Sequence, residues 1–258
     1  MLVYFSVLIG CGVFVSLSEK YRTAALYLTL LIAIIFPFIS DTERWNLFYF
    51  AKTYSVVIPI FILAFIQSKF YHELEWIKNL QTYIPNLVKF VFILNILEGC
   101  LLLLSIDQYI LLVVGLILII TMPTFSFNEH QNIGFENIPW VMCYTLCFIL
   151  AVILYPNQTN FIFPITIAVF IPIVFCYFIK DWSKWFSFRV YSIYFILVLD
   201  VLFSNGDFLI YDSVSGFLSL QNNEINSKQE VLIQSLAIPI GAYLLIKWWK
   251  IRTKMNYN

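Results

Sequence analysis

The sequence predicts an all-α protein, a polytopic bundle of transmembrane helices that forms a single domain over residues 1–258. Two properties of the chain lead to this prediction. Hydrophobic residues make up 61% of the sequence and charged residues only 12%, whereas a soluble domain carries about 25% charged residues. The apolar residues also gather in about nine long runs. Because so few polar residues cannot cover a water-soluble globule, we expect most of the surface to face the lipid bilayer.

These runs have the length that a membrane helix requires. A helix rises about 1.5 Å per residue, so about 20 residues cross the hydrocarbon core. The runs are continuous in Leu, Ile, Phe and Val, whereas the strands of a membrane barrel alternate apolar and polar residues. We therefore expect helices over residues 2–17, 25–39, 46–67, 87–105, 108–127, 138–155, 161–179, 185–204 and 230–249.

The first run is expected to be a retained span, since Met1–Leu17 lacks the basic start and the small-residue cleavage site of a signal peptide. Lys and Arg predict the orientation, because loops rich in them stay on the cytoplasmic side. Nine spans place Arg44 and Lys228 on one side and eleven basic residues on the side of the C-terminus: Lys20, Arg22, Lys69, Lys78, Lys89, Lys180, Lys184, Lys247, Lys250, Arg252 and Lys254. We therefore predict a multi-pass protein of the cell inner (plasma) membrane, with its N-terminus outside and its C-terminus inside.

Composition and motifs argue against several functions. The formal net charge is +0 and no basic patch lies away from the membrane edges, which argues against a nucleic-acid partner. No Ser-His-Asp set, HExxH, glycine-rich phosphate loop or carboxylate pair is readable, so the sequence does not favour an enzyme and leaves any cofactor unknown. The cysteines lack the spacing of a zinc or redox motif and are expected to pack as small apolar residues; they are Cys11, Cys100, Cys143, Cys147 and Cys176.

Asn95 and Glu98 interrupt the apolar run over residues 87–105. A carboxylate at that depth costs roughly 2.5 to 3.5 kcal/mol on insertion scales, so we expect a group inside the bundle to compensate it. In the predicted orientation Lys52 lies roughly 9 Å below the outer end of its span, and Glu98 roughly 10 Å below the end of its own. We therefore predict that Lys52 and Glu98 form an ion pair or share a polar ligand, with Asn95 one turn away on the same face. The alternative is a pair that only fixes helix register.

The run over residues 185–204 carries two further charges, Arg189 and Asp200, on one face, because eleven residues make about three helical turns. Arg189 lies near the cytoplasmic end, where it either joins this polar stripe or snorkels to lipid phosphates. Asp200 lies about one turn from the outer end and either reaches water or joins the level of Lys52 and Glu98. Glu19 follows the first run and is expected to be solvated.

Two further features leave alternatives open. Asn205–Gln229 mixes apolar residues with Ser and Gly, which is compatible with a re-entrant, an interfacial or a solvated segment. Prolines interrupt or edge several runs. Each frees a backbone carbonyl that can line a cavity, although one proline alone predicts only a kink; they are Pro37, Pro59, Pro123, Pro164, Pro172 and Pro239.

Several short motifs of the chain resemble those of one protein family. They are Ser18-Glu19-Lys20, Trp45 with Lys52-Thr53-Tyr54-Ser55, and ILNILEG over Ile93–Gly99. In these pieces, and in the order of its spans from about residue 8 to residue 249, the chain resembles an uncharacterised family of bacterial multi-pass inner-membrane proteins, a domain of unknown function. The resemblance implies a helical inner-membrane protein. It singles out five residues of this chain as candidates for a site: Glu19, Lys52, Tyr54, Asn95 and Glu98. It implies no activity.

The chain departs from that family at two polar segments. Where the family has an Asn- and Gly-rich stretch, Asp107–Leu118 keeps little beyond Gly115. Where the family carries Tyr-Asp-x-Trp-Asn, Cys143–Cys147 keeps only Tyr144. If those polar groups form a site in relatives, this chain has lost or remodelled it.

The leading functional prediction is a transporter-like or channel-like bundle for a small solute or ion. Lys52, Asn95 and Glu98 form its polar centre in this hypothesis, with Tyr54, Arg189 and Asp200 in support. Two alternatives use the same residues: an integral-membrane enzyme acting on a lipid-soluble substrate, and an accessory membrane subunit whose buried charges only set assembly. The oligomeric state is left open.

Overall fold

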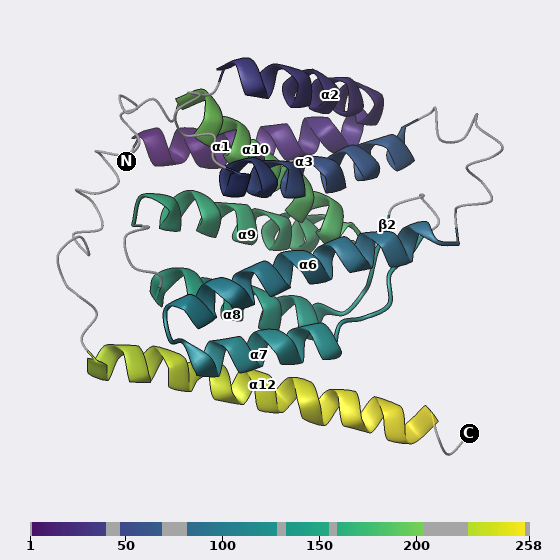
Figure 1. Cartoon of the computed structure of the whole chain (residues 1–258). Helices are drawn as coiled ribbons and strands as arrows, with labels where there is room; N and C mark the ends of the chain where they lie inside the picture. Colours follow the sequence, from purple (N-terminus) through teal and green to yellow (C-terminus); the bar gives the residue numbers. More distant parts are fainter. Residues whose placement is uncertain are drawn as a thin grey trace.

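Helices account for most of the residues that the computed structural model describes, which are residues 2–39, 47–68, 82–127, 133–154, 159–203 and 227–255. Figure 1 shows most of them stacked side by side with their long axes running in similar directions, while α10 crosses the stack obliquely. The described helices are α1 (Leu2–Lys20), α2 (Arg22–Ile39), α3 (Leu47–Gln67), α6 (Ile84–Ser105), α7 (Tyr109–Ile120), α8 (Ile138–Leu154), α9 (Thr159–Ile179), α10 (Trp185–Phe203) and α12 (Ser227–Met255), with a short 3₁₀ turn η2 (Trp182–Lys184).

Each of these nine described α-helices overlaps one of the predicted apolar runs. The prediction of a helical chain is therefore confirmed in its coarse form. Within the described ranges, two helical segments are long and apolar enough to cross a membrane by length and composition, Ile84–Ser105 and Gln229–Thr253. Shorter apolar helices include Tyr109–Ile120 and Ile138–Leu154.

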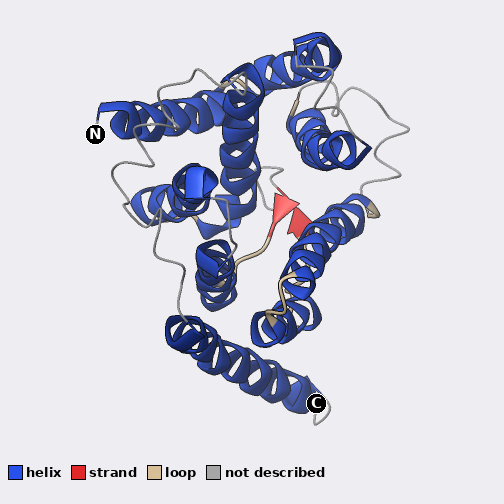
Figure 2. Cartoon of the chain, turned by 60° about the vertical axis from the view of Figure 1, so that its left-hand side comes forward, coloured by secondary structure: helices blue, strands red, loops and turns tan. Residues whose placement is uncertain are grey.

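In the predicted run over residues 108–127, the helix ends before the apolar run does. The helix α7 stops at Ile120, and the chain continues into two short antiparallel strands, β1 (Ser126–Phe127) and β2 (Ile133–Gly134). Pro123 explains the stop, because a proline disfavours helical backbone at the preceding residue and cannot donate a helix hydrogen bond. Figure 2 shows this hairpin in red among the helices.

The hairpin is held against η2 by a glycine. A Cβ atom added to Gly134 would overlap the carbonyl oxygen of Ser183. Only a glycine therefore allows β2 to lie this close to η2. The contact anchors the start of α10, which follows η2 directly.

Helix α10 is the central element of the fold. It packs against α1, α2, α3 and α9 as well as against β2. Consecutive residues along its first half are buried, from Trp185 through Ser192. A helix that is buried all round belongs in the interior of a bundle. Polar side chains on α10 therefore face protein, and each needs a partner there.

Aromatic rings fill the core beside the start of α10. Phe92 of α6 contacts five other rings at centroid distances between 5.4 and 6.3 Å. Its partners are Phe125, Trp140, Tyr144, Trp185 and Phe186. Because such edge-to-face pairs favour one arrangement of the rings, this cluster fixes α6, α8 and α10 relative to one another. Helix α12 lies outside it, against α7 and α8 (yellow in Figure 1).

Candidate functional site

A partly open cavity of about 270 Å³ lies between the helices, lined by residues of α6, α7, α8, α9 and α10. Most of its wall is apolar, with side chains such as Phe148 and Ile193. Three strongly polar residues also line it: Asn95 and Glu98 from α6 and Arg189 from α10. An apolar cavity with a few convergent polar groups is the usual form of a small-molecule site.

Helix α6 presents its two polar residues together. Asn95 and Glu98 are three residues apart, so they project from one face of the helix. Both are half-buried. Gly99 follows Glu98, and a Cβ added there would meet nothing within 4 Å. Asn95 and Glu98 therefore lie on one face of α6, and both line the cavity.

Arg189 is the charged residue that the fold buries most deeply among those described. It is 3% exposed. Its Nη1 atom donates a hydrogen bond of 3.4 Å to the carbonyl oxygen of Ala168, and its guanidinium carbon lies 5.1 Å from the centroid of the Phe148 ring. Its Nε atom is buried and has no hydrogen-bond partner among the described residues. The described residues thus satisfy the guanidinium only in part.

The carbonyl of Ala168 is available to Arg189 because of the proline four residues later. A helical carbonyl normally accepts from the N–H of the fourth residue along, and Pro172 has no N–H to donate. Ala168 instead accepts from Arg189 and, at 2.6 Å, from the hydroxyl of Ser192. Ala168 lines the cavity, so the carbonyl that Pro172 leaves free belongs to a residue of the cavity wall.

The structure corrects one of the sequence alternatives. Snorkelling of Arg189 to lipid phosphates is wrong, because a side chain 3% exposed cannot reach the bundle surface. The sequence does not reveal that Arg189 is buried, because a position near the end of a span predicts a short path to the membrane interface. What decides the matter is that α10 is the central helix of the fold.

The remaining predicted site residues are placed only in part. Helix α3, which carries Lys52 and Tyr54, contacts α6, which carries Glu98. The side chains of Lys52, Tyr54 and Asp200 lie outside the described residues. The ion pair between Lys52 and Glu98 therefore stays a prediction, as does a role for Asp200. Residues 205–226 of the Asn205–Gln229 segment also lie outside the described residues.

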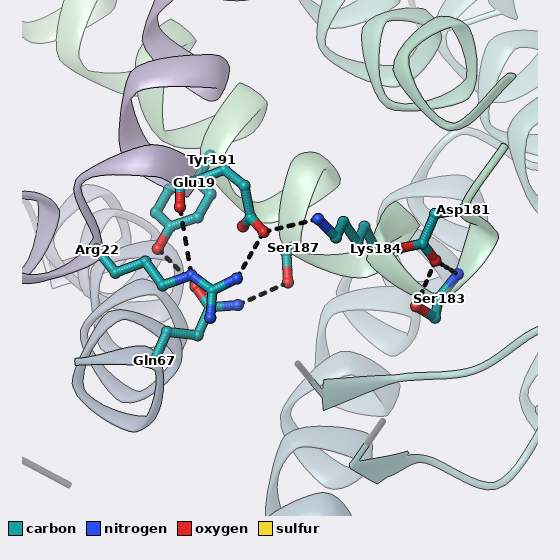
Figure 3. Close-up of polar contacts among 8 residues, drawn as sticks. All are labelled: Glu19, Arg22, Gln67, Asp181, Ser183, Lys184, Ser187 and Tyr191. Atoms are coloured by element: carbon teal, nitrogen blue, oxygen red, sulfur yellow. Dashed lines mark hydrogen bonds and ion pairs between the residues drawn. The ribbon is translucent and has the colours of Figure 1, made fainter. Parts of the chain in front are cut away.

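A second polar cluster joins the ends of several helices, and Figure 3 shows it. Glu19 at the end of α1 accepts from Arg22 at 2.7 Å and pairs with Lys184 of η2 at 3.2 Å. The expectation that Glu19 is solvated is wrong: its side chain is 14% exposed. The reason is tertiary, because η2 brings Lys184 against the end of α1.

Gln67 at the end of α3 continues this cluster. Its amide nitrogen donates to the Ser187 hydroxyl at 3.0 Å, and its amide oxygen accepts from the Tyr191 hydroxyl at 3.0 Å. Sequence reasoning missed this link. Its one signal was a polar residue, Gln67, at the end of an apolar run. The two bonds tie α3 to α10 (Figure 3).

No protein-family model, curated protein or solved structure matches this chain. The resemblance to the uncharacterised membrane family therefore stays a prediction. Gly115 and Tyr144, the residues kept in the two segments where the chain departs from that family, both line the cavity.

Metal chemistry finds no support in the described part of the chain. No three His, Cys, Asp or Glu side chains there are grouped so as to hold a metal ion. The five cysteines are buried and carry free thiols, as expected for small packing residues. What the site offers is a guanidinium, a carboxyl and an amide around an apolar space.

Proposed function

We propose that this chain is a transporter-like or channel-like membrane protein for a small solute or ion. In this proposal all nine described α-helices cross the inner membrane, with the N-terminus outside and the C-terminus inside. The polar centre comprises Asn95 and Glu98 with Lys52, and Tyr54, Arg189 and Asp200 support it.

The outer surface of the bundle supports the membrane part of this proposal. Large apolar side chains are well exposed on several helices, including Leu101 at 66%, Phe178 at 76% and Trp249 at 65%. Side chains of this kind are the ones that a lipid-facing helix surface presents to the hydrocarbon core. In Figure 1 the N- and C-termini lie at opposite ends of the stacked helices, the arrangement that an odd number of crossings would give.

The single observation that carries the transport part is the cavity. Intramembrane ionisable residues that face a cavity mark solute or ion pathways, because burying them is otherwise costly. Here a guanidinium and a carboxyl from α10 and α6 line one cavity of about 270 Å³. A purely structural bundle would gain nothing from leaving that space unfilled, since close packing adds dispersion energy.

The proposal is tested by flux. The full chain is reconstituted in liposomes that contain a pH-sensitive dye, and uptake of radiolabelled carboxylates, amino acids and alkali cations is followed together with internal pH. We expect uptake of at least one of these classes above protein-free liposomes. Glu98→Gln should abolish it while the variant still folds.

A matched variant controls for the charge change itself. Glu136→Gln makes the same substitution at an exposed residue outside the cavity, and flux should remain. Turnover of an added lipid or quinone-like compound without flux would support the enzyme alternative instead. Flux unchanged in Glu98→Gln would remove Glu98 from the pathway.

A further inference from the structure

We infer that Arg189 binds the carboxylate of a small amphipathic monocarboxylate whose apolar body occupies the cavity. This inference deepens the proposed function, on which it rests, by naming the class of solute. It depends on three properties of the site: the incomplete hydrogen bonding of a buried guanidinium, the charge balance of the cavity, and the apolar character of its wall.

The guanidinium has bonding capacity left over. An Arg side chain carries five N–H donors in a planar fork and stays charged in proteins. Its described hydrogen bond is the long one to Ala168, and its Nε is buried without a partner among the described residues. Arg189 takes part in neither of the described ion pairs, which join Glu19 to Arg22 and to Lys184. A carboxylate fits the fork, since it accepts two parallel N–H bonds.

The charge balance selects a monoanion. Arg189 supplies one positive charge, whereas the Glu98 carboxyl, which lines the same cavity, is compensated by Lys52 in the proposed function. A second negative charge on a ligand would be repelled by the Glu98 carboxyl in surroundings of low dielectric constant. A phosphate dianion is therefore disfavoured relative to a carboxylate. Repulsion of an unwanted ligand is a common source of binding specificity.

The wall of the cavity selects an apolar body. Side chains from four helices other than α10 supply mainly aliphatic and aromatic surface, for example Leu103, Leu111, Phe148 and Ala151. A fully hydrophilic solute would lose its hydration without compensation on such a surface. The volume, about 270 Å³, lies just below the usual range of about 300 to 1,000 Å³ for ligand pockets. It suits one short-chain acid rather than a membrane lipid.

The test is calorimetric binding to the full chain in nanodiscs of neutral lipid. The probes are hexanoate, hexanol, hexylamine and hexyl phosphate, which share a chain and differ in their head group. We expect saturable binding of hexanoate, with each of the other three weaker by about tenfold or more, since a charge-assisted bidentate bond is lost or repulsion is added. Hexanol binding as tightly as hexanoate, or hexyl phosphate binding more tightly, would overturn the inference.

Two variants test the charge and the space of the site separately. Arg189→Gln removes the charge, and Ala151→Leu keeps the charge but fills part of the cavity. Both should weaken hexanoate binding by about tenfold or more, and Arg252→Gln, at an exposed residue of α12, should not. If Arg189→Gln fails to fold, the Ala151→Leu result decides. Hexanoate binding unchanged in either folded cavity variant overturns the inference.

The binding assay and the flux assay together distinguish a failure of this inference from a failure of the transport proposal. Flux of any solute class without hexanoate binding would overturn this inference and leave the transport proposal standing. Hexanoate binding that depends on Arg189, without flux of any solute, would support the inference and overturn transport.

Discussion

The guanidinium of Arg189 lies over the ring of Phe148, 5.1 Å from its centroid. This contact and one 3.4 Å bond to Ala168 are the compensation that the described residues give a charge buried in the middle of the bundle. A cation–π contact contributes about 2 kcal/mol when desolvated, whereas desolvation of a buried ion costs several kcal/mol. The folded chain therefore carries a net cost at Arg189 unless a ligand or a second charge offsets it.

Replacement of Arg189 by Met should not destabilise the ligand-free protein. Met has a similar length and needs no hydrogen bonds, so the substitution removes the desolvation cost together with the weak bonds. We expect the melting temperature of Arg189→Met in nanodiscs to equal or exceed that of the wild type. A gain of 1 kcal/mol would correspond to roughly 2–4 °C for a chain of this size.

Ser192→Ala is the control for that measurement, since its hydroxyl makes a 2.6 Å bond to the same carbonyl of Ala168. Loss of such a buried bond costs about 1 kcal/mol, so this variant should melt below the wild type. If Arg189→Met also melts below the wild type, the guanidinium stabilises the fold and carries no net cost there.

Sequence alone predicts the helices well and their ends less well. The apolar runs match helices because hydropathy reports burial in lipid or protein over a whole segment. Helix α12 extends past the predicted run, which ends at residue 249, to Met255, since residues such as Arg252 are good helix formers that hydropathy reads as a loop. Helix α7 ends early because Pro123 changes the backbone without lowering hydropathy.

The candidate site is predictable as a list of residues but not as an arrangement. Charges inside apolar runs single out Glu98 and Arg189. Which of them meet depends on how α6, α8 and α10 pack, and no periodicity in the sequence contains that information. The same holds for Glu19, whose partner Lys184 is distant along the chain and arrives only through the packing of η2.

Glu19→Gln should destabilise the protein by about 1 to 3 kcal/mol, because it removes the acceptor of two charge-assisted bonds. The side chains of Glu19, Arg22 and Lys184 are between 14% and 26% exposed, so solvent screens these pairs only weakly. The loss should be larger than that caused by Lys184→Met. Thermal denaturation of the three proteins in detergent micelles measures it, with Glu136→Gln as the exposed control. Equal melting temperatures of Glu19→Gln and the wild type would show that the contacts of Glu19 with Arg22 and Lys184 do not stabilise the fold.

Lys52 and Glu98 are predicted to compensate each other across α3 and α6, which are in contact. Lys52→Glu and Glu98→Lys should each lower the melting temperature, since each leaves like charges within the bundle. The double reversal should restore at least half of the loss, which a double-mutant cycle isolates as a coupling energy. Absence of any rescue in the double variant counts against direct pairing. Full flux in Lys52→Met and Glu98→Gln, with reduced melting temperatures, would indicate a pair that is only structural.

Gly115 sets how closely α7 approaches α6. A Cβ at this position would lie 2.6 Å from the Sγ atom of Cys100, so Gly115→Ala must push the two helices apart or move the thiol. Such overpacking costs about 1–3 kcal/mol, which melting in nanodiscs would detect. Gly99→Ala is the matched control, since its Cβ meets nothing within 4 Å and alanine favours the helix by about 1 kcal/mol. Adding Cys100→Ala to Gly115→Ala removes the clashing atom and should recover stability. If Gly115→Ala alone melts like Gly99→Ala, the two helices do not pack as closely as described.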